Sequence, residues 1–336
     1  MHLIWFKNGI LKITMTSRIE ISTRTILFTV AVIAGGWLVI QIRDIIFFLF
    51  IAFIIMSVLR PVVDRMESWR LARALAILLI YAVLLSAVFV FGSVIVPPLV
   101  NESVKLMQNL PHYISQIAPD VRFNLETLIP QIAPVGTNVA RFTVGIFSNV
   151  ISIFTILVFS FYFLLEAKRL PDILNSLVGN ETGKRVITVL SKAEKRMGAW
   201  VRGQLLLMLI IGQATFIGLS LLGVNYALPL ALIAGTLEIF PFIGPNIAAI
   251  PAILVGFIAS PGLGVLVAIM YFVIQQLENN IIVPAVLQRA VGVPPVISLI
   301  ALMIGGRLAG VLGIILAVPI LLVVQTVMEA VWKRKE

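Results

Sequence analysis

Residues 203–246 read GQLLLMLIIGQATFIGLSLLGVNYALPLALIAGTLEIFPFIGPN and contain a single charged side chain, Glu238. The apolar run then continues to Leu277 without another charge. A helix needs about 20 apolar residues to cross the ~30 Å hydrocarbon core of a bilayer. The run is long enough for several such helices, and it predicts an all-α polytopic membrane protein.

The composition of the whole chain indicates the same class. Hydrophobic residues make up 60% of the 336 residues and charged residues 12%, whereas soluble domains average roughly 45–50% apolar and ~25% charged residues. A soluble enzyme and a disordered chain are therefore excluded. The chain has no cysteine and only two histidines, so we expect no disulfide framework, no metal site and no cysteine nucleophile.

Charge-free runs and turn signals predict about eight transmembrane helices. Proline and glycine interrupt the sixth run, 228–258, and the last, 296–331, which predicts broken or re-entrant helices in the C-terminal half. The expected organisation is a cytoplasmic segment 1–24, spans 1–3 in 25–98, an extracytoplasmic amphipathic region 99–141, span 4 in 142–165, a cytoplasmic amphipathic region 166–202, a transport region 203–331 and a cytoplasmic tail 332–336.

Basic residues are concentrated in alternate loops. Nineteen of the 25 lie in 1–24, 60–73, 166–202 and 333–336, and cytoplasmic loops carry such an excess. We therefore expect a cell-membrane protein with both termini in the cytoplasm. The net charge of +10 reflects this bias rather than nucleic-acid binding. The first 24 residues do not resemble a signal peptide. If 228–258 is re-entrant, every later segment changes side.

The amphipathic region within 166–202 allows two interpretations. Residues Val186, Leu190 and Met197 share one helical face, and basic side chains lie opposite. The helix could rest on the anionic inner surface of the membrane. Alternatively, it could contact another subunit. The extracytoplasmic region 99–141 has helical spacing as well, but four prolines divide it into short pieces.

Glu238 is the main candidate functional residue. It lies about ten residues into its run, or ~15 Å, close to the middle of a ~30 Å core. A charge at that depth costs at least ~2.5 kcal/mol and marks a functional site by default. The residues that follow it can break the helix and offer loose carbonyls or an amide: Pro241, Gly244, Pro245 and Asn246. A proline kink with Glu238 paired to an arginine is the structural alternative.

Two further polar elements follow. Gln275, Glu278 and Asn279 are spaced i, i+3 and i+4, so they share a helical face. Their place near the end of a span also fits an ordinary interface with water. Arg307 follows two glycines, 305 and 306, and could pair with Glu238 or Glu278 or bind an anionic substrate.

A faint internal repeat relates the two interrupted runs. Residues 249–255, AIPAILV, resemble 317–323, AVPILLV, at an offset of 68. At this offset Glu238 is equivalent to position 306, next to Arg307. Broken helices at equivalent positions of two repeats are the pattern of a midplane transport site. A re-entrant segment would make the repeats inverted rather than parallel.

Several of these strings together resemble the autoinducer-2 exporter family. They are EIFPFIGPN at 238–246 with AIP at 249–251, QQLENNIIVP at 275–284, VGVPP at 291–295, Gly305-Gly306, and GIILAVP at 313–319. The resemblance implies an eight-span homo-oligomeric transporter that exports small molecules such as autoinducer-2, or exchanges sodium for protons. It implies functional roles for Glu238, Pro241, Gly244, Pro245, Glu278, Asn279 and Arg307.

The favoured function is therefore a secondary transporter of a small polar molecule or ion. A carboxyl group in a low-dielectric site holds its proton tightly, so Glu238 could couple transport to H+ or Na+. No nucleotide-binding loop and no catalytic triad is present, so neither ATP as a cofactor nor enzyme activity is expected. The alternatives are a passive pore formed by a homo-oligomer and a Na+/H+ antiporter.

Overall fold

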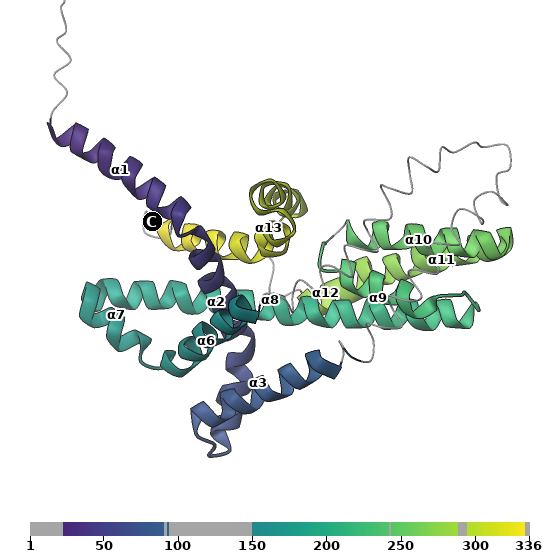
Figure 1. Ribbon diagram of the computed structural model, residues 1–336, viewed down its shortest axis with the longest axis horizontal. Helices are drawn as coiled ribbons and strands as arrows, with labels where there is room; N and C mark the ends of the chain where they lie inside the picture. The colour runs from purple at the N-terminus through teal and green to yellow at the C-terminus, as the bar shows by residue number, and fades with distance from the viewer. Residues whose placement is uncertain (1–22, 91–92, 94–149, 242, 288–293, 333–336) are drawn as a thin grey trace, which may run out of the picture. The chain divides into compact units, whose positions relative to one another are not determined.

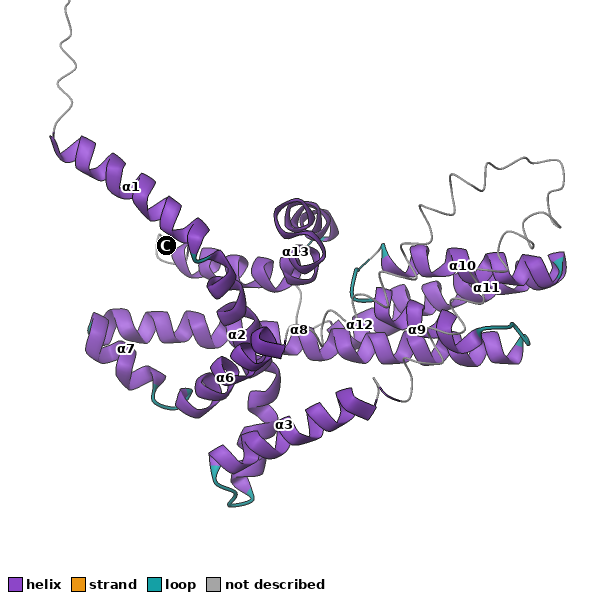
Figure 2. Cartoon of the chain, viewed as in Figure 1, coloured by secondary structure: helices purple, strands orange, loops and turns teal. Residues whose placement is uncertain are grey.

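The computed structural model describes residues 23–90, 93, 150–241, 243–287 and 294–332. The region 99–141 lies outside the described residues. All secondary-structure elements within those ranges are helices (Figure 2). In a bilayer the backbone has no water to bond, and a helix satisfies its own N–H and C=O groups. The all-α class expected from the sequence is thereby confirmed.

The chain divides into two compact units, residues 1–47 and 48–336. The described part of the first unit is α1 (Thr23–Gln41) with the beginning of α2 (Arg43–Ser68). Every residue of α1 is exposed although most are apolar. In water this exposure would be costly, whereas a lipid environment covers it.

In the second unit, α2 packs with α3 (Arg73–Val90) and α6 (Val150–Glu166) around a buried apolar cluster. Arg73 fixes the end of this group because its guanidinium binds both Asp64 and Glu67, at 2.8 and 2.7 Å. After α6 the chain bends by 82° into the short helix α7 (Leu170–Val178). The bend falls where the amphipathic region 166–202 was expected to leave the membrane.

The long helix α8 (Asn180–Leu221) is the common support of the second unit. Its 42 residues extend over about 63 Å. In the first half of α8, the carboxylate of Glu194 forms an ion pair of 2.6 Å with the guanidinium of Arg60 on α2. The carboxylate of Glu329 pairs with Lys192 at 2.6 Å and Arg196 at 2.9 Å. Helix α8 therefore joins helices from both halves of the chain.

The C-terminal half of α8 packs against α9 (Ala227–Leu237) and α11 (Pro261–Leu277). Helix α10 (Gly244–Ala259) packs in turn against α9 and α11, and the four helices are seen together in Figure 1. Helices α9 and α10 extend about 16 and 24 Å, too short for each to cross a ~30 Å core. They also pack against each other, so the chain folds back between Leu237 and Gly244. This hairpin matches the re-entrant alternative for 228–258.

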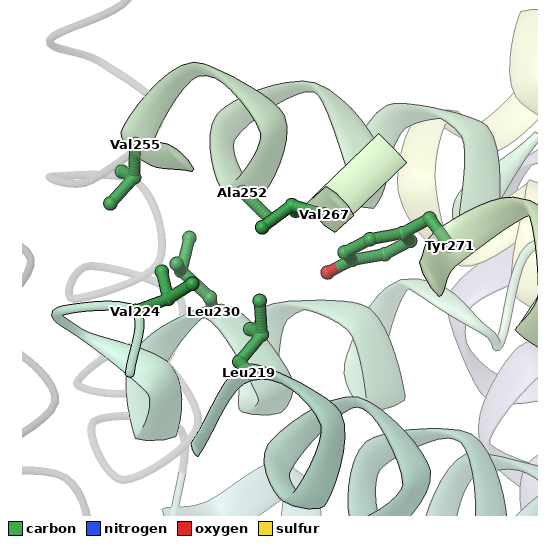
Figure 3. Close-up of a cluster of buried hydrophobic side chains, with 7 residues drawn as sticks. All are labelled: Leu219, Val224, Leu230, Ala252, Val255, Val267 and Tyr271. Atoms are coloured by element: carbon green, nitrogen blue, oxygen red, sulfur yellow. The ribbon is translucent and has the colours of Figure 1, made fainter. Parts of the chain in front are cut away.

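An apolar cluster holds this hairpin to its neighbours (Figure 3). Leu219 of α8, Leu230 of α9, Ala252 of α10 and Val267 of α11 are each at most 1% exposed. One side chain therefore comes from each of the four helices. Burying a leucine or valine side chain completely stabilises a fold by about 1.5–3 kcal/mol.

Helix α11 continues through a π-helical turn, Glu278–Ile282, into α12 (Val283–Leu287). The last helix, α13 (Pro295–Trp332), has non-helical backbone angles at Ala309 and Gly310. Added Cβ atoms on Gly305 and Gly313 would each meet the other's carbonyl group. In a straight helix these residues would be about 12 Å apart, so α13 also folds back. The internal repeat of the sequence has an offset of 68 residues. Adding 68 to the residue numbers of the α9–α10 turn gives the turn of α13.

Among the described residues, six helices are long and apolar enough to span a membrane, or seven if the bent pair α6–α7 forms one span. The expectation of about eight transmembrane helices with broken or re-entrant ones in the C-terminal half is confirmed at this level. The two interrupted runs fold as hairpins because proline and glycine remove the bonds that would keep each helix straight.

Substituting Gly244 by alanine should destabilise the α9–α10 turn. A Cβ at position 244 would meet the backbone carbonyl of Leu237, and backbone cannot move aside cheaply. We expect G244A to lower the free energy of unfolding by about 1–3 kcal/mol, measured by thermal unfolding in detergent. G262A is the control, because a Cβ there meets nothing within 4 Å. Equal unfolding midpoints for both variants would contradict the close approach.

Candidate functional site

The turn between α9 and α10 is built from backbone groups that proline leaves without their helical partners. Pro241 has no N–H to bond the carbonyl of Leu237, and this carbonyl accepts from Phe240 at 2.9 Å instead. The carbonyl of Pro241 accepts from Ile243 at 2.9 Å, because Pro245 cannot donate to it. The turn is thus held by short-range bonds that replace the α-helical ladder.

The backbone carbonyl of Glu238 is satisfied from another helix. The side-chain amide of Gln204, on α8, donates to it at 2.5 Å, and both residues are buried. Gln204 thereby fixes the end of α9 to the middle of α8. An unpaired carbonyl at this position would cost about 1–3 kcal/mol.

Two buried carboxyl groups, one at this turn and one at the end of α11, are close enough to act on each other electrostatically. Glu238 is 2% exposed and Glu278, at the end of α11, is 5% exposed. Each has one carboxyl oxygen without a hydrogen-bond partner, and no ion pair to a described residue includes either group. The arrangement is therefore a pair of acidic groups that a positive charge would neutralise.

The other predicted site residues lie around this pair with different exposure. Gly244 and Pro245 are buried in the turn, and Pro241 and Gln275 are half-buried. Asn246 and Asn279 are exposed. The structure thus brings Glu238, Glu278 and the buried turn residues together. The roles of all these residues in binding stay predictions.

Arg307 lies elsewhere in the chain's fold, near the turn of α13. Its side chain is exposed, and none of the ion pairs among described residues joins it to Glu238 or Glu278. Among the described arginines, none forms an ion pair with Glu238, so the structural alternative is not found in this part of the chain. A role in binding an anionic substrate remains a prediction.

Three polar residues of this region were not predicted from the sequence. Gln204 donates to the turn, Tyr271 belongs to the neighbouring apolar cluster, and Thr215 is a buried residue of α8. The spacing of these residues is a sequence signal that they share a helical face with other polar residues. Thr215 follows Gln204 by eleven residues, and Glu278 follows Tyr271 by seven, and both spacings return to the same face of a helix.

Comparison with known proteins agrees with this architecture. The sequence pattern of the AI-2E family transporter matches residues 26–333. YrrI of Bacillus subtilis (strain 168), named as a transport protein by inference, is 30% identical over 87% of both chains. A sodium-lithium/proton antiporter of Halobacillus andaensis is 26% identical over 82% of this chain and 86% of its own. The AI-2 transport protein TqsA of Escherichia coli (strain K12) is 25% identical over 83% and 84%.

Replacing Gln204 by leucine should loosen the turn. The change leaves the buried carbonyl of Glu238 without its donor, so we expect a loss of about 1–3 kcal/mol in the free energy of unfolding. Thermal unfolding in detergent measures the effect, and amide hydrogen exchange locates it at the end of α9. Q213L is the matched control, because Gln213 is exposed on the same helix. A loss as large in Q213L would show that the bond to Glu238 is unimportant.

Proposed function

The chain belongs to the AI-2E transporter family, and we propose that it is a carrier for a small polar molecule or ion whose movement is coupled to a cation at Glu238. Family and relatives indicate a multi-pass membrane transport protein rather than an enzyme. The proposed site comprises Glu238, Glu278, Gln275 and Asn279, with the turn residues Pro241, Gly244, Pro245 and Asn246. Arg307, near the turn of α13, is proposed as a separate group that binds an anionic substrate.

The observation that carries the proposal is the unpartnered carboxyl oxygen of Glu238 at the α9–α10 turn. A buried polar group without a partner is costly, and a buried charge is tolerated only when it is paired or neutralised. Because Glu278 adds a second acidic group, the site favours one bound positive charge. A proton or a small monovalent cation supplies that charge.

The surrounding backbone gives this site a means of opening. Gln204 holds the α9–α10 turn through a hydrogen bond to the carbonyl of Glu238, and Phe240 and Ile243 donate to carbonyls within the turn itself. Movement of the hairpin along α8 would break that single bond and expose the carboxyl pair. Release of the cation and uptake of another from the opposite side would then follow.

Contacts along α8 support the proposed cytoplasmic position of both termini. Glu329, near the end of α13, pairs with Lys192 and Arg196 in the basic segment at the start of α8. The α9–α10 hairpin opens at the other end of α8, where Val224 and Val255 pack against Leu219. If α1, α2, α3, α6, α8 and α11 cross and both interrupted segments are re-entrant, the chain returns to the side on which it began.

The relatives support two substrate classes. The AI-2 transport protein favours export of a small polar, autoinducer-2-like molecule. The sodium-lithium/proton antiporter favours Na+/H+ exchange, which the carboxyl pair would serve directly. Assembly as a homo-oligomer in the cell membrane is proposed from the family resemblance and the charge bias. A passive pore through such an oligomer is the alternative, and it would give flux that does not saturate and shows no counterflow.

Replacing Glu238 by glutamine should uncouple transport from the proton gradient. Glutamine keeps the size of the side chain, but its amide group cannot bind and release a proton as a carboxyl group does. In proteoliposomes loaded with a fluorescent pH indicator, the proton flux that a cation gradient drives should be at least about tenfold lower for E238Q than for the unmodified protein. The same assay run with and without an imposed pH gradient separates coupling from uncoupled flux.

The control is E181Q, because Glu181 is an exposed glutamate at the start of α8. We expect E181Q to transport as the unmodified protein does. Flux through E238Q that is undiminished and still responds to the pH gradient would remove Glu238 from coupling. Flux that never saturates would favour the pore.

A further inference from the structure

A groove with a basic lining runs along the first half of α8. It has a volume of about 550 Å³ and is lined by Ile187, Thr188, Ser191, Lys192, Lys195 and Arg196. These residues form two rows with a spacing of four, so they share one face of the helix. The volume is within the ~300–1,000 Å³ of small-ligand sites, and the cationic side chains favour an anion as the occupant.

One carboxylate neutralises part of this positive charge. Glu329 of α13 pairs with Lys192 at 2.6 Å and with Arg196 at 2.9 Å. Lys195 is exposed and forms no ion pair with any residue that the structure describes. Three basic groups and one carboxylate leave a net charge of two positive units at the groove. The ion pairs also hold two of the cations in position before an anion arrives, which reduces the cost of binding.

Ser191 supplies a hydrogen-bond donor on the same face as Lys195. The hydroxyl of Thr188 donates to the carbonyl of Lys184 at 2.8 Å, so its hydrogen is already used. Ser191 is half-buried, and its hydroxyl makes no hydrogen bond among the described residues. Lys195 lies four residues further along the helix, which makes the two side chains neighbours. An oxyanion in the groove therefore accepts from one hydroxyl and one ammonium group.

Helix α7 indicates where this part of the chain lies in the membrane. Lys168 and Arg169 lie at the 82° bend between α6 and α7. Charged side chains are costly inside the hydrocarbon, so the bend lies at the membrane surface. Because α7 leaves α6 at nearly a right angle, it follows this surface. Its side chains Ile173, Leu177 and Val178 are 42–74% exposed, and exposed apolar side chains are typical of an interfacial helix.

Contacts of α7 and the end of α13 place the groove at the same surface. Gly183 of α8 approaches α7 so closely that an added Cβ would meet Asn175. On α13, Glu329 is followed by Trp332, which is 69% exposed at the end of the helix, and tryptophan is enriched at membrane–water interfaces. In the sequence, residues 333–335 are all basic, as in segments that bind anionic lipids.

We propose that the groove binds the phosphate of an anionic phospholipid. The hydroxyl of Ser191 and the ammonium group of Lys195 donate to the phosphate oxygens, and Lys192 and Arg196 contribute positive charge. Because a carboxylate of α13 shares two of these cations, a bound lipid stabilises the contact between α8 and the end of α13. The proposal favours the membrane-surface interpretation of this amphipathic region, and it does not depend on the proposed transport mechanism.

Titrating lipid into the full-length protein in a neutral detergent tests the site. Phosphatidylglycerol should raise the unfolding midpoint by mass action, whereas zwitterionic phosphatidylcholine should not. A lysine beside an anionic lipid contributes about 1 kcal/mol, so K195Q should raise the mole fraction of lipid at half-maximal effect about fivefold. The double variant S191A/K195Q should raise it at least about tenfold. Neither variant removes a bond to a described residue, so both should fold.

The control is K184Q, which removes the same charge from an exposed position of α8 outside the groove. It should respond to phosphatidylglycerol as the unmodified protein does. An equal loss of response in K184Q and K195Q would show diffuse attraction to a charged surface and overturn a defined site. An unmodified protein that phosphatidylglycerol does not stabilise would also overturn it. Stabilisation by inorganic phosphate as large as that by the lipid would assign the groove to a soluble anion instead and refute the lipid proposal.

Discussion

Inside a bilayer every backbone hydrogen-bonding group needs a partner within the protein, and the turn between α9 and α10 depends on this requirement. Two prolines remove donors that would have continued the helix, and Phe240 and Ile243 take over the exposed carbonyls. The carbonyl of Glu238 is reached by Gln204 of α8. The turn is therefore possible only where another helix supplies a side-chain donor.

Helix α8 is long enough to contact both broken segments, the α9–α10 hairpin and α13. Its beginning is fixed to α2 by Glu194 and to the end of α13 by Lys192 and Arg196. Its later half supports the hairpin through Leu219 and Gln204. Ion pairs hold the end of α8 that carries charges. Among the described residues, apolar packing and the hydrogen bond from Gln204 hold the hairpin to the other end.

Glu238 is destabilised in its charged form by two effects, burial in an apolar helix and the nearby carboxyl group of Glu278. A carboxyl group in an apolar helix is costly unless something neutralises it. Glu278 increases the cost, because it adds a like charge rather than a partner. A positive charge at the pair would remove this cost.

Hydropathy and helix breaking are local properties of the chain, so the amino-acid sequence alone predicts the membrane class and the interrupted segments, and it indicates Glu238, Pro241 and Gly244 as candidate site residues. It also indicated the repeat that relates the two turns. Packing between helices shows that both interrupted segments fold back, that Gln204 donates to the turn, and that Arg307 forms no ion pair with Glu238. These features depend on contacts between residues far apart in the chain, and local patterns carry no information about which helix will lie alongside.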